Sequence, residues 1–186
     1  VDIVLDFAAM TPQQVYNSLQ IPVEKEKLLQ IKNLIIGGAA IDPVLEKEIQ
    51  SFPNAVYSTY GMTETLSHIA LRGLNGESRS EYYIPFQSVD LSLSEKSTLV
   101  IKAPFAYENE VVTNDVAELN PDGSFRVLGR IDNVINTGGV KIQIEVVESK
   151  LKQYFFFPFV ITSVPDPKFG EVVALLTEQE LNESNK

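Results

Sequence analysis

The feature that most constrains the fold is an alternation of short apolar segments with helix starts in the first third of the chain. Asn33 to Ile36 is predicted to form a short buried strand that ends at Gly37-Gly38, and Ala55 to Ser58 a second short strand. Asp42-Pro43 between them, like Thr11-Pro12 before them, combines a capping residue with proline at the first helical position. Strand, helix and strand in this order predict a parallel sheet with helices packed on it.

The pattern changes after Ser67, where short segments alternate between apolar and polar residues. Asp122-Gly123 predicts a hairpin turn between the last two of these segments. A small β-rich unit therefore follows the parallel α/β layer. Its strands are expected at residues 68–71, 88–93, 98–102, 115–119 and 124–128.

Strand and helix patterns alternate again beyond Arg130, which predicts a small α+β unit. We expect a strand near Val134, a helix over residues 145–153, and strands over 159–164 and 171–177. The fold class is α/β and α+β. We place one domain over residues 1–130 and a second over residues 131–186, with the boundary near the glycine and charged residues at 129–132.

Composition excludes several classes of function. The net charge of −10 disfavours nucleic acid or an anionic membrane as a partner. The sequence contains no run of 18 apolar residues and no basic segment at its start, so we expect neither a membrane span nor a signal peptide. The 186 residues contain no cysteine and one histidine, His68, so disulfides and thiol catalysis are excluded and a zinc site is not expected. A cytoplasmic enzyme is the plain expectation.

Four stretches resemble the adenylate-forming superfamily of acyl–CoA synthetases, luciferases and peptide-synthetase adenylation domains. They are GGAAI, YGMTET, TNDVAEL and GRIDNVINTGGVKIQIEVVES, beginning at Gly37, Tyr60, Thr113 and Gly129. The resemblance implies the C-terminal part of a large adenylation domain followed by an incomplete small mobile domain. It also implies the chemistry: a carboxylate and ATP form acyl-AMP and pyrophosphate, and CoA then displaces AMP.

The first two stretches carry groups suited to a nucleotide. Glycine after a strand lets the backbone approach a ligand, although an ordinary turn is the alternative. An aromatic ring offers a face to a purine, and a Thr-Glu pair offers a hydroxyl to phosphate and a carboxylate to Mg²⁺. The resemblance implies adenine contacts from Gly38, Ala39, Ala40 and Tyr60, and catalytic roles for Thr63 on the α-phosphate and Glu64 on the metal.

The last two stretches supply further candidates. Asp115 is an acceptor suited to a ribose diol and Arg130 a fixed-charge donor, and the resemblance implies that both hold the sugar. It also places Lys141 facing the phosphate, although a solvated lysine is the alternative. Asp132 matches the hinge about which the small domain turns, and Gly138-Gly139 matches the loop that meets the pantetheine arm of CoA.

Specific segments resemble the o-succinylbenzoate–CoA ligases of menaquinone biosynthesis, namely AAMTPQQVYNSL, YGMTETLSHIALR and SVPDPKFGE. In related aryl–CoA ligases the strand after YGMTET borders the acyl pocket, so Ser67 and His68 are acyl-pocket candidates. A lone histidine is otherwise more often an ordinary core or surface residue. A ligase for another aryl, fatty or short-chain acid is the alternative within the superfamily.

Two family segments have no counterpart in these residues: the phosphate-binding loop rich in Ser, Thr and Gly, and the catalytic lysine in a Gly-Lys context. We therefore expect a truncated chain that is itself inactive, and a non-catalytic module is the alternative from another class. The expected ligands of the parent enzyme are a small carboxylate, ATP, Mg²⁺ and CoA. Self-association into a homo-oligomer stays open.

Overall fold

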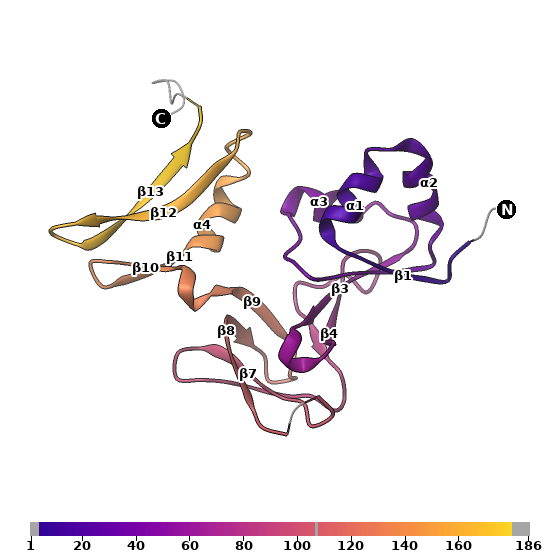
Figure 1. Cartoon of the computed structure of the whole chain (residues 1–186), viewed down its shortest axis with the longest axis horizontal. Helices are drawn as coiled ribbons and strands as arrows, with labels where there is room; N and C mark the ends of the chain where they lie inside the picture. Colours follow the sequence, from indigo (N-terminus) through magenta and orange to yellow (C-terminus); the bar gives the residue numbers. More distant parts are fainter. Residues whose placement is uncertain (1–3, 107, 180–186) are drawn as a thin grey trace. The chain divides into compact units, whose positions relative to one another are not determined.

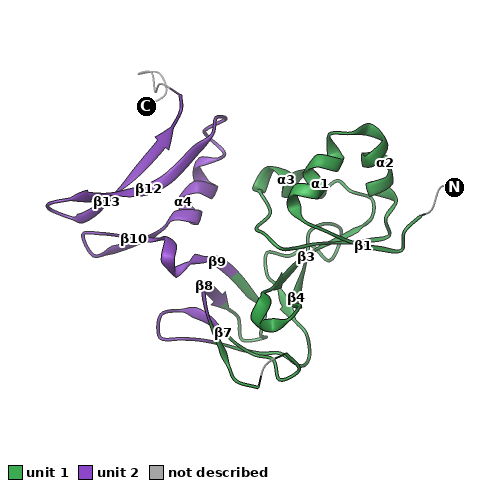
Figure 2. Ribbon diagram, in the orientation of Figure 1, with its two compact units in different colours: residues 1–92, 100–112, 119–126 green, residues 93–99, 113–118, 127–186 purple. Residues whose placement is uncertain are grey.

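The computed structural model describes residues 4–106 and 108–179 and contains three sheets among them (Figure 1). The strand orders are β1-β2-β3-β4-β5, β6-β7-β8-β9 and β11-β10-β13-β12. The chain divides into two compact units (Figure 2). The first comprises residues 1–92, 100–112 and 119–126, and the second comprises residues 93–99, 113–118 and 127–186. The combination of α/β and α+β structure confirms the predicted fold class.

The first sheet contains the predicted parallel strands. Its members are β1 (Phe7–Met10), β2 (Asn33–Ile36), β3 (Ala55–Gly61), β4 (His68–Gly73) and β5 (Ile84–Pro85). Strands β1, β2 and β3 are parallel, with Leu34 opposite Val56, whereas β4 and β5 add to the same sheet in antiparallel orientation. The segment at 68–71 therefore extends the parallel sheet instead of opening the β-rich unit.

Three helices accompany this sheet: α1 (Pro12–Leu19), α2 (Pro22–Gln30) and α3 (Pro43–Ile49). The two predicted helix starts are confirmed: Thr11 and Gln14 form a reciprocal capping box, and Asp42 Oδ1 accepts from the Val44 N–H. Helix α2 was not predicted, because Ile21 before it offers no side-chain cap. Burial in this region is centred on a cluster that includes Val15, Leu34, Ile36, Ile49 and Val56.

The second sheet consists of β6 (Asp90–Leu93), β7 (Thr98–Lys102), β8 (Val111–Leu119) and β9 (Phe125–Arg130), in chain order across the sheet. The predicted turn at Asp122-Gly123 joins the last two strands. Gly123 has φ +85°, and Asp122 Oδ1 accepts from the Ser124 N–H and hydroxyl at 2.9 and 2.7 Å. Those hydrogen bonds lower the pKa of the Asp122 carboxyl.

The third sheet is antiparallel and lies within the second unit. It contains β10 (Val134–Thr137), β11 (Val140–Gln143), β12 (Phe159–Asp166) and β13 (Gly170–Thr177), with α4 (Ile144–Leu151) between β11 and β12. The sequence predicted a strand near Val134 but not β11. The domain boundary at residue 130 stays a prediction. No helix in the described part of the chain is long and apolar enough to span a bilayer.

Candidate functional site

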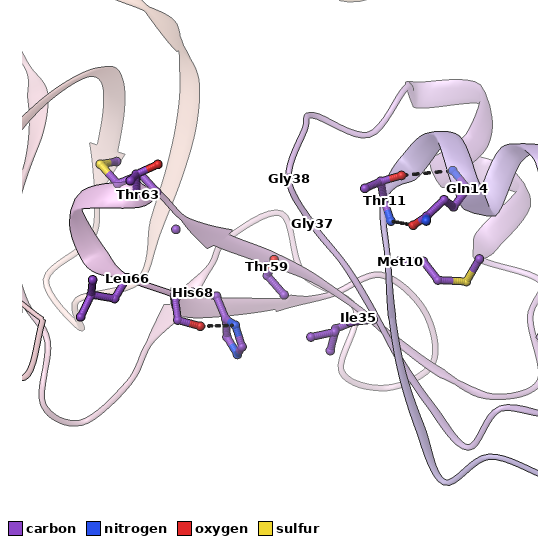
Figure 3. A pocket seen from close by; sticks show the side chains of 14 residues that line it. Met10, Thr11, Gln14, Ile35, Gly37, Gly38, Thr59, Thr63, Leu66 and His68 are labelled. Carbon is purple, nitrogen blue, oxygen red and sulfur yellow. Dashed lines mark hydrogen bonds between the residues drawn. The ribbon is translucent and has the colours of Figure 1, made fainter.

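A cavity of about 530 Å³ opens in the first unit, at the carboxyl ends of its parallel strands (Figure 3). Three segments line it: the end of β1 with the start of α1, the turn after β2, and the loop between β3 and β4. Carboxyl ends of parallel strands are the usual position of ligand sites in open α/β sheets. The lining residues are Ala9, Met10, Thr11, Gln14, Ile35, Gly37, Gly38, Thr59, Gly61, Met62, Thr63, Leu66, Ser67 and His68.

The turn after β2 forms one wall, and glycine is required there for two reasons. A Cβ on Gly37 would overlap the Thr59 hydroxyl, and Gly38 has φ +86°. The Gly37 N–H donates to the Met10 carbonyl at 3.1 Å, which ties the turn to the end of β1. Of the three predicted adenine contacts in this turn, Gly38 lines the cavity. Ala40 instead borders a separate hollow against α1 and α3.

The loop between β3 and β4 forms the opposite wall and is tightly held. A bulge interrupts the strand pairing at Gly61, where a Cβ would come within 2.5 Å of the Ser67 carbonyl oxygen and 2.6 Å of His68 Cα. The hydroxyl of Thr65, whose residue is 1% exposed, lies 3.0 Å from the Met62 N–H and 2.7 Å from the Ser67 carbonyl oxygen. The predictions missed Thr65, although its place inside YGMTET was a signal.

The same loop displays the predicted catalytic residues. Thr63 and Glu64 lie on a 3₁₀ turn (Thr63–Thr65), and both are exposed immediately before the buried Thr65. Thr63 lines the cavity, so its hydroxyl is available to a ligand there. Glu64 belongs to the same exposed turn but is not among the cavity-lining residues.

Both predicted acyl-pocket residues line this cavity as well. Ser67 Oγ lies 3.3 Å from His68 Nδ1 (Figure 3). The rings of His68 and Phe86 pack in a T-shaped arrangement at a centroid distance of 5.6 Å. An imidazole beside a hydroxyl and an aromatic ring can both hydrogen-bond and pack against a ligand. The structure thus brings Gly38, Thr63, Ser67 and His68 to one cavity.

Tyr60 faces away from that cavity. Successive side chains of a strand point to opposite faces, and Thr59 and Gly61 occupy the cavity side. The Tyr60 ring packs edge-on against Phe125 at 5.1 Å and tilted against Tyr83 at 5.9 Å. Its contact with a purine stays a prediction.

In the second unit, the side chains of Asp115 and Arg130 lie close together, and their contact with a ribose stays a prediction. Arg130 Nη1 is 3.4 Å from Asp115 Oδ1, and Arg130 Nη2 is 3.3 Å from Asp132 Oδ2. Asn114 Nδ2 also donates to Asp132 Oδ2 at 3.2 Å, a contact that the sequence did not predict. The Arg130 and Asp132 side chains are each more than half exposed, so that pair is open to solvent, whereas the Asp115 side chain is 15% exposed.

The predicted CoA-channel glycines form the two-residue turn between β10 and β11. Gly138 and Gly139 have φ +57° and +88°, the left-handed values of a tight hairpin. A Cβ on Gly138 would meet the Phe169 ring at 2.9 Å, whereas one on Gly139 would meet open space. Lys141 follows on β11 and is exposed, which leaves its two interpretations open.

A magnesium ion fits this chain only in company with a substrate. Within the described residues, no three side chains of His, Cys, Asp or Glu gather into a metal site. Mg²⁺ in nucleotide enzymes is held by one or two carboxylates together with phosphate oxygens and water. A single exposed carboxylate such as Glu64 suits that arrangement.

Comparison with known proteins gives the relatives of this chain. It is 27% identical over 177 residues to the 4-chlorobenzoate–CoA ligase of Arthrobacter sp., which covers 80% of the chain. The structure of an acyl-CoA synthetase (AMP-forming)/AMP-acid ligase II-like protein from Dyadobacter fermentans matches 99% of the chain at 32% identity, with a TM-score of 0.67. By sequence and by fold, the chain is a relative of the AMP-forming acyl–CoA ligases.

Other adenylate-forming enzymes share the fold at lower identity. The o-succinylbenzoate CoA synthetase of Bacillus subtilis, solved with the acyl-adenylate OSB-AMP, matches 96% of the chain with a TM-score of 0.72 at 19% identity. No protein-family model matches the chain. The chain spans 34% of the length of the chlorobenzoate ligase and 54% of the Dyadobacter protein.

Proposed function

We propose that the protein to which these residues belong is an AMP-forming acid–CoA ligase, with o-succinylbenzoate as its acid. It joins a carboxylate to the α-phosphate of ATP with release of pyrophosphate, and then transfers the acyl group to the thiol of CoA with release of AMP. The observation that carries the proposal is the cavity at the end of the parallel strands, because Gly38, Thr63, Ser67 and His68 all line it.

In the first half-reaction, the turn after β2 receives the adenylate. Gly38 offers backbone without bulk to the adenine. The motif match assigns Ala39, Ala40 and Tyr60 to the same base, and these contacts require Ala40 and the Tyr60 ring to turn toward the cavity from their present places. The Thr63 hydroxyl donates to an oxygen of the α-phosphate, where negative charge builds in the transition state. Glu64 would hold the magnesium ion, whose charge stabilises the phosphate oxygens.

The sugar of the nucleotide is assigned to the Asp115 carboxylate, which accepts from the ribose hydroxyls. Arg130 Nη1 at 3.4 Å orients that carboxylate and donates to the same sugar. Lys141 is assigned to the phosphate. These roles follow from the matching motifs, and the proximity of Asp115 to Arg130 supports the ribose assignment.

The second half-reaction is assigned to two segments: the linker between β9 and β10, which comprises Ile131–Asn133, and the Gly138-Gly139 turn between β10 and β11. Backbone rotation at Asp132 brings the Gly138-Gly139 turn to the pantetheine arm of CoA. The two glycines have no side chains, which leaves room for that arm. A Cβ on Gly139 would meet nothing within 4 Å, which supports this assignment.

The acid is the least constrained part of the proposal. The residues that line the cavity include no Asp, Glu, Lys or Arg, and Ser67 and His68 offer hydrogen bonds to a polar aromatic acid. The B. subtilis enzyme of the same fold holds an o-succinylbenzoyl-adenylate, which supports this acid. The chlorobenzoate ligase relative favours another aromatic acid as the second candidate.

Thioester formation by the product of the complete gene tests the proposal. The substrates are ATP, CoA and one acid from a panel: o-succinylbenzoate, 4-chlorobenzoate, a long-chain fatty acid and acetate. We expect kcat/KM for o-succinylbenzoate to exceed the others by roughly tenfold or more, because a site built for polar groups rejects acids that lack them. A preference for another acid would reassign the substrate. Failure with every acid would favour a non-catalytic module.

A further inference from the structure

One carboxylate in the second unit collects hydrogen bonds from both ends of the linker. Glu145, the second residue of α4, accepts at Oε1 from Asn133 Nδ2 at 2.6 Å and from the Arg130 N–H at 3.3 Å. Its other oxygen, Oε2, accepts from Gln143 Nε2 at 2.6 Å. A carboxylate with three donors is a strong anchor, because hydrogen bonds to an ionised acceptor are roughly twice as strong as neutral ones.

The backbone before the linker is fixed by the same side chains. Gln143 Nε2 also donates to the Arg130 carbonyl at 2.8 Å, so both polar groups of the Arg130 backbone are bonded to side chains at the start of α4. A Cβ on Gly129, which has φ +151°, would come within 2.5 Å of Gln143 Nε2 and of Glu145 Oε2. The close approach therefore depends on glycine at this position.

The electrostatics keep the anchor charged. Partial burial acts to raise the pKa of the Glu145 carboxyl, but the hydrogen bonds from Gln143, Asn133 and the backbone outweigh it and hold the pKa below its ordinary value. The carboxylate also lies in the first turn of α4, where the helix dipole favours negative charge.

The hydrogen bonds to Glu145 come from both sides of Asp132, so they depend on the backbone conformation of the linker. Arg130 precedes Asp132 and Asn133 follows it, and both donate to the same oxygen of Glu145. Rotation of the backbone at Asp132 changes the distance between those two donors. Glu145 Oε1 can hold both in one linker conformation and must release at least one of them in another.

We propose that Glu145 is a positioning residue that latches the linker across Asp132 and so sets the balance between the two half-reactions. The effect on the two half-reactions rests on the proposed function, whereas the hydrogen bonds of Glu145 to Arg130 and Asn133 are a property of the 186-residue chain. It can therefore be tested without nucleotide.

Amide hydrogen exchange by NMR tests the latch. In Glu145→Ala of the 186-residue chain, the Arg130 amide should exchange roughly fivefold faster or more, because it loses its acceptor. Glu148→Ala is the matched control: Glu148 lies on the same helix and its Oε1 accepts from the Ile161 N–H at 3.0 Å. That control should speed Ile161 exchange and leave Arg130 unchanged. Unchanged Arg130 exchange in Glu145→Ala, or an equal change in Glu148→Ala, would overturn the latch.

A second measurement separates positioning from general support of the fold. In the product of the complete gene, Glu145→Gln, which keeps the size of the side chain, should change single-turnover pyrophosphate release and acyl transfer to CoA in opposite directions. A weakened latch favours one linker conformation at the expense of the other, whereas damage to folding lowers both rates. Parallel losses would overturn the positioning role. An intact latch in the exchange experiment, in a protein that makes no thioester at all, would instead contradict the proposed function.

Discussion

The loop between β3 and β4 and the linker after β9 are both built around glycine and hydrogen bonds, but they are held in different ways. The loop is fixed by the buried Thr65 hydroxyl and by backbone packed against Gly61. The linker is held by side chains that can reach solvent, among them Arg130 and Asp132. Removing a buried hydroxyl leaves its hydrogen-bond partners unpaired, which costs about 1–3 kcal/mol of stability. An exposed ion pair contributes only about 0–1 kcal/mol to stability. The contrast separates a tightly packed wall of the cavity from a linker with solvent-exposed side chains.

The largest effect should come from removing the close approach at Gly61. In Gly61→Ala, the new Cβ meets backbone atoms at 2.5 and 2.6 Å, and backbone cannot move aside as a side chain can. We expect a loss of about 2–4 kcal/mol in the free energy of unfolding, measured by urea denaturation. Gly76→Ala is the control, because a Cβ there meets nothing within 4 Å and only its φ of +60° adds strain. Equal losses in the two variants would contradict the packing argument.

The Thr65 hydroxyl should come next. Thr65→Val keeps the shape of the side chain but leaves the Met62 N–H without its acceptor at 3.0 Å. The free energy of unfolding should fall by about 1–3 kcal/mol. Thr63→Val on the same turn removes an exposed hydroxyl and should change stability by less than about 0.5 kcal/mol. Similar values for the two variants would show that the loop is not anchored at Thr65.

Substitution at Gly139 should have an intermediate effect on stability and a selective one on activity. Gly139→Ala and Gly139→Leu both place a side chain at φ +88° and should each cost about 1–2 kcal/mol. Only the leucine fills the open space beside the turn. In the product of the complete gene, both variants should release pyrophosphate in a single turnover, and only Gly139→Leu should fail to transfer the acyl group from acyl-AMP to CoA. Parallel loss of both steps would contradict the channel assignment.

The smallest change in stability should follow Asp132→Asn. The carboxylate is 59% exposed and its contacts with Arg130 and Asn114 are 3.3 and 3.2 Å long. Unfolding free energy should change by less than about 0.5 kcal/mol in thermal or urea denaturation at moderate salt. A loss of more than about 1 kcal/mol would show that the linker contributes to stability as the loop between β3 and β4 does, and would contradict the distinction between the two regions.

Local signals explain how much of this architecture was predictable. Thr11-Pro12 and Asp42-Pro43 are short-range capping signals, so the helices after them were predicted. Helix α2 has only Leu28 buried and no side-chain cap, so neither periodicity nor capping indicated it. Gly38, Thr63 and His68 meet at one cavity because strands from distant segments pair with each other. No local signal predicts such pairing, so these residues were proposed as site residues from the motif resemblance alone. The hydrogen bonds of Glu145 depend on side-chain geometry that no spacing rule supplies.

The proposed function requires that the cavity at the ends of the parallel strands receives the acyl-adenylate. His68 lines that cavity and is the only histidine in the sequence, so its imidazole proton signals in NMR need no assignment by mutation. Titration of the 186-residue chain with a non-hydrolysable analogue of o-succinylbenzoyl-adenylate should shift those signals saturably, and Thr63→Val should weaken the apparent affinity. Signals of His68 that stay unchanged up to millimolar analogue, or that shift identically in Thr63→Val, would contradict the claim.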